Sequence, residues 1–172
     1  DYQHAGVVRK VNREAIEAQL KADQVVLLSP LGFSPTGEVF NLSTPELASA
    51  VASQIHADKL IILSHEDVLD EHGEQIQTLD VRQAEALEET LPVGSFLRQT
   101  LAAVCDAVNA GVPRAHIVPA KLDGGVLLEL FQHDGVGCMV TQNSLESLRV
   151  ATVDDLGGIL QLIAPLEQDG TL

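Results

Sequence analysis

The sequence predicts an α/β protein in which helices cover both faces of a mainly parallel sheet, a three-layer αβα sandwich. Short apolar runs typical of buried strands alternate along the chain with amphipathic segments of helical length. Helical patterns of about 10–15 residues between strands are typical of βαβ units, which build parallel sheets. The chain has 172 residues and is 45% hydrophobic, which is enough for one domain with its own core.

The first elements are predicted from residues 7–29. Residues 7–11 (Val-Val-Arg-Lys-Val) predict a short strand, and Asn12 is suited to cap a helix that runs through Ile16 and Leu20. Residues 24–29 contain Val-Val-Leu-Leu, a continuous apolar run that predicts a strand buried on both faces.

Residues 31–43 carry Gly, Pro and a Thr-Gly pair, and they predict a loop. Thr44 as N-cap and Pro45 in the first helical position predict the start of a helix. The side chains that this helix is expected to bury are Leu47, Val51 and Ile55.

The rest of the sheet follows from the same alternation of strand and helix patterns. In chain order we expect a strand over 59–63, a turn over 70–73, helices over 80–91 and 96–110, a strand over 115–118, a helix over 125–132 and a strand over 138–141. Gly111 is suited to end the longest helix.

The pattern changes near Asn143. Residues 148–151 predict a strand and residues 154–166 a helix, but no further strand follows to pair with them. We therefore expect one domain over 1–143, and a linker with the first βα unit of a second domain over 144–172.

The net charge of −15 argues against nucleic acid and anionic membranes, which are bound by clustered Lys and Arg. Two cysteines, Cys105 and Cys138, give no disulfide framework and indicate a reducing, cytoplasmic setting. There is no signal peptide and no apolar run near the length of a membrane span. The six histidines have no metal-ligand spacing, so no metal site is predicted.

The segment Gly-Glu-Val-Phe-Asn-Leu-Ser-Thr-Pro-Glu, from Gly37 to Glu46, is the most informative motif. It resembles the Gly-Glu-x-x-Asn-x-Asn-x-Asp substrate loop of N-acetylglutamate kinase. Three further stretches, at 59–64, 111–117 and 127–137, follow in the same order as in that family. The resemblance implies the C-terminal half of an amino-acid kinase (carbamate kinase-like) fold.

The departures from the kinase motif remove its charged groups. Asn41 is kept, but Ser43 replaces the second Asn and Pro45 replaces the Asp that organises the kinase lysines. The resemblance places Thr100 at the lysine that neutralises the transferring phosphoryl group, and no lysine occurs between Lys59 and Lys121. The resemblance therefore implies a vestigial kinase site and no catalytic residue in this chain. Ser64, where the kinase touches nucleotide, is expected to be vestigial as well.

The segment 148–156 resembles the opening strand and helix of a GNAT acetyltransferase domain. A kinase-like domain followed by a GNAT domain is the layout of the bacterial N-acetylglutamate synthases. This resemblance implies a full-length amino-acid N-acetyltransferase, a homo-oligomer that makes N-acetyl-L-glutamate from L-glutamate and acetyl-CoA at the start of arginine biosynthesis. The kinase-like part is expected to sense L-arginine as inhibitor, to bind no cofactor itself and to be inactive alone.

The same resemblance places Glu129 at the glutamate that binds L-arginine in that family, with Gly135 and Gly137 in the adjoining loop. A carboxylate suits a guanidinium because it accepts two parallel hydrogen bonds. Lys59 is a candidate for the effector's carboxylate. The alternatives are a solvated helical glutamate for Glu129 and an ordinary surface lysine for Lys59.

Residues 132–137 match a Gln-x-x-Gly-x-Gly pyrophosphate signature of GNAT enzymes, but a helix is predicted before it and a strand after it. That order is inverted relative to a phosphate-binding helix N-terminus, so we interpret the match as chance. Two alternatives stay open for the whole chain: an arginine-sensitive acetylglutamate kinase that uses ATP, and a non-catalytic sensor of another amino acid.

Overall fold

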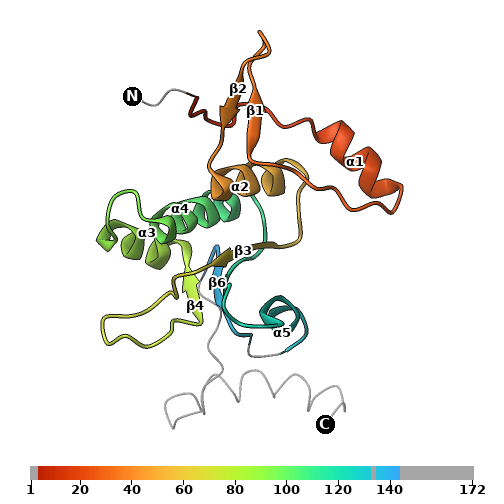
Figure 1. The fold of residues 1–172 in the computed structure, drawn as a ribbon. Helices are drawn as coiled ribbons and strands as arrows, with labels where there is room; N and C mark the ends of the chain where they lie inside the picture. The colour runs from red at the N-terminus through yellow and green to blue at the C-terminus, as the bar shows by residue number, and fades with distance from the viewer. Residues whose placement is uncertain (1–3, 133–134, 144–172) are drawn as a thin grey trace, which may run out of the picture.

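A computed structural model describes residues 4–132 and 135–143 of the chain (Figure 1). Its elements in chain order are α1 (Arg13–Lys21), β1 (Leu31–Phe33), β2 (Val39–Asn41), α2 (Thr44–Gln54), β3 (Leu60–Ser64), β4 (Thr78–Asp80), α3 (Val81–Thr90), α4 (Phe96–Asn109), β5 (Ala115–Pro119), α5 (Gly125–Phe131) and β6 (Cys138–Thr141). The predicted helices at 80–91, 96–110 and 125–132, the strands at 59–63, 115–118 and 138–141 and the turn at 70–73 are confirmed to within a few residues. The GNAT-like segment lies outside the described residues.

The main sheet has four strands in the order β3-β5-β6-β4. β3 runs parallel to β5, and β4 runs parallel to β6, while β5 and β6 pair antiparallel. The sheet is therefore mixed and mostly parallel. β4 is a strand of only three residues that the sequence did not signal.

Helix α4 is the centre of the main core. Leu101, Val104 and Ala107 on this helix are completely buried against β3, β5 and β6, and α2 and α3 pack on its flanks. Because 14 residues give α4 about four turns, one helix spans the width of these strands.

Alternation along β5 places the two helical layers on opposite faces. Ala115 and Ile117 belong to the core cluster beneath α4, whereas His116 and Val118 face the other way and contact α5. Figure 1 agrees, with α2, α3 and α4 on one side of the sheet and α5 on the other. The predicted αβα order is confirmed.

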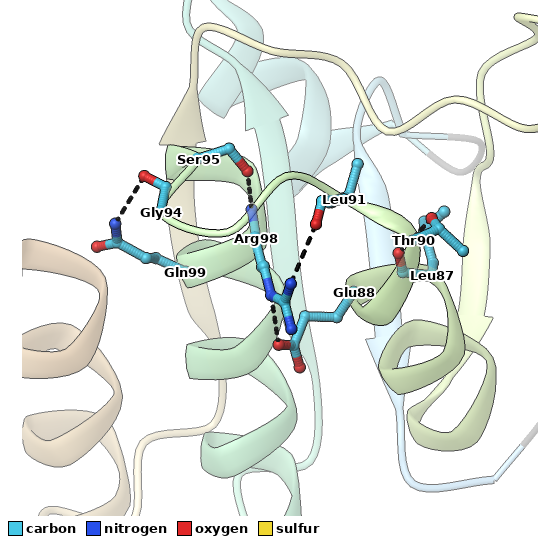
Figure 2. A network of polar contacts seen from close by, with 8 residues as sticks. All are labelled: Leu87, Glu88, Thr90, Leu91, Gly94, Ser95, Arg98 and Gln99. Atoms are coloured by element: carbon cyan, nitrogen blue, oxygen red, sulfur yellow. Dashed lines mark hydrogen bonds and ion pairs between the residues drawn. The ribbon is translucent and has the colours of Figure 1, made fainter.

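The turn between α3 and α4 is held by a polar network (Figure 2). Arg98 donates to a carboxylate oxygen of Glu88 at 3.2 Å and to the carbonyl of Leu91 at 3.1 Å. The hydroxyl of Ser95 caps α4 by accepting from the backbone N–H of Arg98. A cation beside the last carbonyls of α3 is favourable, because those carbonyls carry the negative end of the helix dipole.

Two predicted strands near the start of the described chain are wrong. Residues 7–11 have no ladder, and residues 24–29 run between α1 and β1 without a strand partner among the described residues. Val25 is 96% exposed and Leu27 is 94% exposed. The apolar run signals a buried strand, but a strand forms only where a neighbouring strand supplies its hydrogen bonds.

The predicted loop over 31–43 is instead a β-hairpin formed by β1 and β2. Its turn uses Gly37 at φ +87°, with a hydrogen bond from the Ser34 N–H to the Glu38 carbonyl. The loop interpretation failed because each strand has only three residues, too few to show a period of two.

Helix α2 begins one residue earlier than predicted. Ser43 is the N-cap, Thr44 is already helical, and Pro45 lies in the first turn. The fully buried side chains on α2 are Pro45, Ser49 and Ala52, whereas Leu47, Val51 and Ile55 are half-buried. The buried stripe on α2, the helix that packs on α4, therefore consists of small residues and a proline in place of the larger apolar side chains.

Leu101→Ala should lower the free energy of unfolding by about 2–5 kcal/mol, because it leaves a cavity in the centre of the core. Leu127→Ala on α5 is the matched control, since that side chain is 61% exposed and should cost less than about 0.5 kcal/mol. Urea unfolding followed by circular dichroism measures both. Equal losses in the two variants would contradict the described core.

Candidate functional site

A buried carboxylate, Glu129, joins three segments that are far apart in sequence. One carboxylate oxygen, Oε1, accepts from His116 Nδ1 on β5 at 2.6 Å. The other oxygen, Oε2, accepts from the backbone N–H groups of Val136 at 2.7 Å and Gly137 at 2.8 Å. Only 4% of the Glu129 side chain is exposed, so the solvated-glutamate alternative is wrong.

Two glycines let the loop before β6 approach this carboxylate. Gly135 has φ +55°, and a Cβ there would lie 2.8 Å from Oε2 of Glu129. A Cβ on Gly137 would lie 2.5 Å from the carbonyl oxygen of Ile117, which no side chain tolerates without movement of the backbone. The loop therefore needs glycine at both positions.

Glu129 is held in its charged form. Burial raises the pKa of its carboxyl, but the hydrogen bonds from Val136, Gly137 and His116 oppose this, and the resulting pKa lies below its ordinary value. An ionised carboxylate only accepts hydrogen bonds, so His116 Nδ1 carries the donated proton. His116 Nε2 is buried and has no partner among the described residues.

A cavity of about 540 Å³ opens beside this loop. Its lining residues are Asp67, Gln75, Gln77, Pro119, Lys121, Leu122, Gly135 and Val136. The amide of Gln75 donates to the Val136 carbonyl at 2.8 Å, so the segment before β4 holds the loop from the side opposite Glu129. The volume lies in the range of small-molecule sites.

The predicted vestigial kinase residues are spread over the β-hairpin and the starts of two helices. Gly37 forms the hairpin turn, and the backbone of Asn41 pairs with His4 and Gly6. Pro45 is buried in the first turn of α2. A second cavity, of about 460 Å³, runs between α2 and α4 and includes Ser43 in its lining.

Ser43 and Thr100 do not face each other. Thr100 is completely buried in the core, with no partner for its hydroxyl among the described residues, whereas the neighbouring Gln99 is exposed and accepts from the Ser43 hydroxyl at 3.4 Å. The nearby cation Arg98 is engaged with Glu88 and Leu91. Within the described part of α4, neither the aligned position nor its neighbour supplies a free positive charge to this loop.

The structure brings together Glu129, Gly135 and Gly137, but not Lys59. Lys59 is exposed just before β3 and makes no ion pair with any described residue. Ser64 is buried, and its hydroxyl donates to the Glu66 carbonyl at 2.7 Å.

Sequence reasoning missed His116, which contacts Glu129, and it missed Gln75 and Lys121, which line the cavity beside residues 135–136. Strand alternation in 115–118 was a usable signal for His116, because it separates that side chain from the core-facing Ala115 and Ile117. For Gln75 and Lys121 no sequence signal existed, since their proximity to residues 135–136 depends on how the loops pack.

Within residues 4–132 and 135–143, no group of three or more His, Cys, Asp or Glu side chains is arranged to hold a metal ion. None of the helices in that same part of the chain is both long enough and apolar enough to cross a membrane.

A profile of the amino acid kinase family matches residues 1–119. The chain is 49% identical over 176 residues to an amino-acid acetyltransferase of Ralstonia nicotianae, covering 100% of this chain and 38% of that protein. It is 44% identical to the amino-acid acetyltransferase of Ectopseudomonas mendocina, covering 100% of this chain and 40% of that protein. The chain thus spans about two fifths of the curated relatives it matches.

Among solved structures, N-acetylglutamate synthase from Neisseria gonorrhoeae, complexed with coenzyme A and L-arginine, superposes with a TM-score of 0.78 and 34% identity. The match covers 94% of this chain and 38% of that one. Carbamate kinase from Giardia lamblia bound to AMP-PNP superposes with a TM-score of 0.61 and 15% identity, covering 79% of this chain and 46% of that one. The latter similarity concerns the fold alone.

Glu129→Gln should destabilise the protein by about 1–3 kcal/mol at pH 7, because three hydrogen bonds to a charged acceptor are weakened. The pKa of Glu129 is lowered on folding, so its contribution is present above the ordinary value of 4.5 and is lost as the pH falls through the lower folded value. Urea unfolding between pH 7 and pH 3 should show the two proteins converging in acid. A difference that is independent of pH would contradict an ionised Glu129.

Gly137→Ala should unfold the loop or cost more than about 2 kcal/mol, because the new methyl group meets the Ile117 carbonyl. Gly73→Ala separates this clash from backbone strain, since Gly73 has φ +81° but open space around it. Its cost should be about 1 kcal/mol, the strain alone. Thermal unfolding of both variants checks the order, and an equal loss would show that the close approach is unimportant.

Proposed function

The chain belongs to the amino acid kinase family, and we propose that it is the catalytically inactive, L-arginine-sensing part of an N-acetylglutamate synthase. In this proposal the full-length protein is an amino-acid N-acetyltransferase that makes N-acetyl-L-glutamate from acetyl-CoA and L-glutamate in the cytoplasm. The observation that supports the sensing role is the set of hydrogen bonds from His116, Val136 and Gly137 to Glu129, which we call the Glu129 hub. Its loop also lines the 540 Å³ cavity. Similarity to an N-acetylglutamate synthase complexed with L-arginine supports the choice of effector.

The loss of kinase chemistry is supported by what occupies the old substrate loop. Pro45 has no ionisable group and contributes to the start of α2, and the α4 side chain that faces Ser43 is the neutral Gln99. Arg98 is tied to the C-terminal end of α3. Removing one preorganised group that stabilises transition-state charge typically costs about 10²–10³ in rate, so two missing charges leave no useful phosphoryl transfer.

Glu129 is suited to recognise a guanidinium, although most of its acceptor capacity is already used. Oε2 accepts two backbone N–H groups, while Oε1 accepts only His116 Nδ1 and keeps one lone pair. A guanidinium that approaches Oε1 meets a charged, buried acceptor, where charge-assisted hydrogen bonds are strong. Val136 donates to Glu129 and also lines the cavity, so a ligand in the cavity would contact the loop that Glu129 holds.

The position of the loop also supports communication between a bound effector and the predicted second domain. Gly137 leads directly into β6, whose four residues end at Thr141, and the linker to the predicted GNAT unit is expected to begin at 144. An effector that changes the loop therefore acts close to the junction between the two predicted domains. In an oligomer the same displacement is repeated in each subunit, which suits feedback control.

Full-length protein should bind L-arginine in isothermal titration calorimetry, and Glu129→Gln should weaken binding by at least about tenfold, because the guanidinium loses its charged acceptor. L-arginine should inhibit acetyl transfer from acetyl-CoA to L-glutamate in the wild-type protein and much less in the variant. Glu71→Gln, a change at an exposed glutamate in the turn before β4, is the charge-matched control.

Absence of arginine binding to the folded, full-length protein would contradict the sensing role. Phosphorylation of N-acetyl-L-glutamate by ATP would instead support the arginine-sensitive kinase. Binding of a different amino acid, found by thermal shift, would support the non-catalytic sensor.

A further inference from the structure

The outer side of helix α5 is an apolar surface that the described residues leave largely uncovered. Leu127, Leu130 and Phe131 are 61%, 39% and 82% exposed, and their spacing of three and four residues places them along one face of the helix. Gly125 and Glu129, also four residues apart, form the opposite, buried face. The main contact of α5 among the described elements is β5, and Figure 1 shows the helix on the side of the sheet opposite α2, α3 and α4. Grouped apolar side chains of this kind mark interaction surfaces.

The contacts of α5 fix its direction across the sheet. The helix begins beside Val118, because a Cβ on Gly125 would lie 3.4 Å from that side chain. One turn later, Glu129 reaches His116. α5 therefore runs back along β5, and its last residue, Phe131, lies toward the end of the sheet where β5 begins.

The described chain leaves the main sheet at that same end. β6 is antiparallel to β5, and its third residue, Val140, is opposite Ala115, the first residue of β5. Thr141, the last residue of β6, therefore lies at the end of the sheet toward which α5 runs. The described residues stop at Asn143, close to the edge where Phe131 is exposed.

The sequence beyond that point, which lies outside the described residues, contains a segment with more apolar surface than one partner can cover. A helix is predicted over 154–166, and residues 156–166 include no charged side chain. At 100° per residue, its Leu and Ile residues would spread over about 160° of a helix, wider than the stripe of about 100° that one packed face requires. These residues are Leu156, Ile159, Leu160, Leu162, Ile163 and Leu166.

We infer that the predicted helix at 154–166 docks on the outer face of α5 and packs with its remaining apolar side against its own domain. The surface on α5 is then an interface between the two predicted domains of one chain. Residues 142–153 can span up to about 40 Å, which is enough to reach any part of a helix about 10 Å long.

The chemistry of the two surfaces also matches. The exposed face of α5 consists of Leu127, Leu130 and Phe131, and the facing segment is uncharged, so docking desolvates no charged side chain of either stripe. None of the three α5 side chains belongs to the main core, so substitutions there leave the core intact. The inference goes beyond the proposed function, since it does not depend on any effector.

Thiol labelling tests whether this face is covered in the full-length protein. The thiol of Phe131→Cys should react with a maleimide at least about tenfold more slowly in the folded protein than in the protein unfolded in urea, because labelling requires the docked segment to open. Peptide mass spectrometry follows this thiol separately from Cys105 and Cys138, which are buried. Equal rates in the folded and unfolded protein would overturn the inference.

Photo-cross-linking identifies the segment that covers α5. In the full-length protein, p-benzoylphenylalanine in place of Phe131 should cross-link to residues 154–166 and leave the chain at its monomer mass on a denaturing gel. The same group in place of Phe33, an exposed aromatic position on the β1–β2 hairpin, is the matched control and should not reach 154–166.

Three results of the cross-linking would overturn the inference. A product of twice the chain mass would show that a second copy covers α5. A cross-link from position 131 to any other segment, or a cross-link from position 33 to 154–166, would remove the assigned pairing. L-arginine is absent from both experiments, so their failure is distinguishable from a failure of the sensing role.

Discussion

The hydrogen bonds of one buried carboxylate join helix α5, strand β5 and the loop that precedes β6. Glu129 on α5 reaches His116 in the middle of the sheet and the two amides that precede β6. Gln75 donates to the Val136 carbonyl and β6 pairs with β5, but among the described residues Glu129 alone accepts the N–H groups of Val136 and Gly137, at the point where Gly137 lies against the Ile117 carbonyl. A buried charge is costly unless it is paired, so the hub is stable only as a complete set.

The surroundings of the substrate-like loop at 37–45 differ from those of the Glu129 loop, and this difference supports the proposed loss of kinase activity and gain of effector binding. Beside the substrate-like loop the Ser43 hydroxyl meets the neutral Gln99, and the nearby cation, Arg98, is bound to Glu88 and Leu91 at the end of α3. Around the effector-like loop an ionised carboxylate, a buried imidazole and a charged cavity converge. In the proposed function, the amino acid kinase scaffold is kept for effector binding, and these groups around Glu129 are the ones that serve it.

Much of the fold could be predicted because helix periodicity and capping residues are local signals. Asp80 and Gln83 form a capping box at the start of the predicted helix α3, and Gly111, with φ +103°, follows the C-cap of α4 as the sequence predicts. A strand was wrongly predicted at 24–29, because an apolar run is typical of buried strands but carries no information on whether a partner strand is present. In the site, the roles of Glu129 and the two glycines rested on a family resemblance, whereas Gln75 and Lys121 enter through loop packing that no local pattern encodes.

Amide hydrogen exchange at Val136 and Gly137 tests most directly whether Glu129 couples an effector to this loop. The account predicts that, in the full-length protein, both amides are protected in the free state, that Glu129→Gln accelerates their exchange, and that saturating L-arginine changes it in the wild-type protein. Exchange at both amides that is the same with and without bound L-arginine, and the same in wild type and variant, would contradict it.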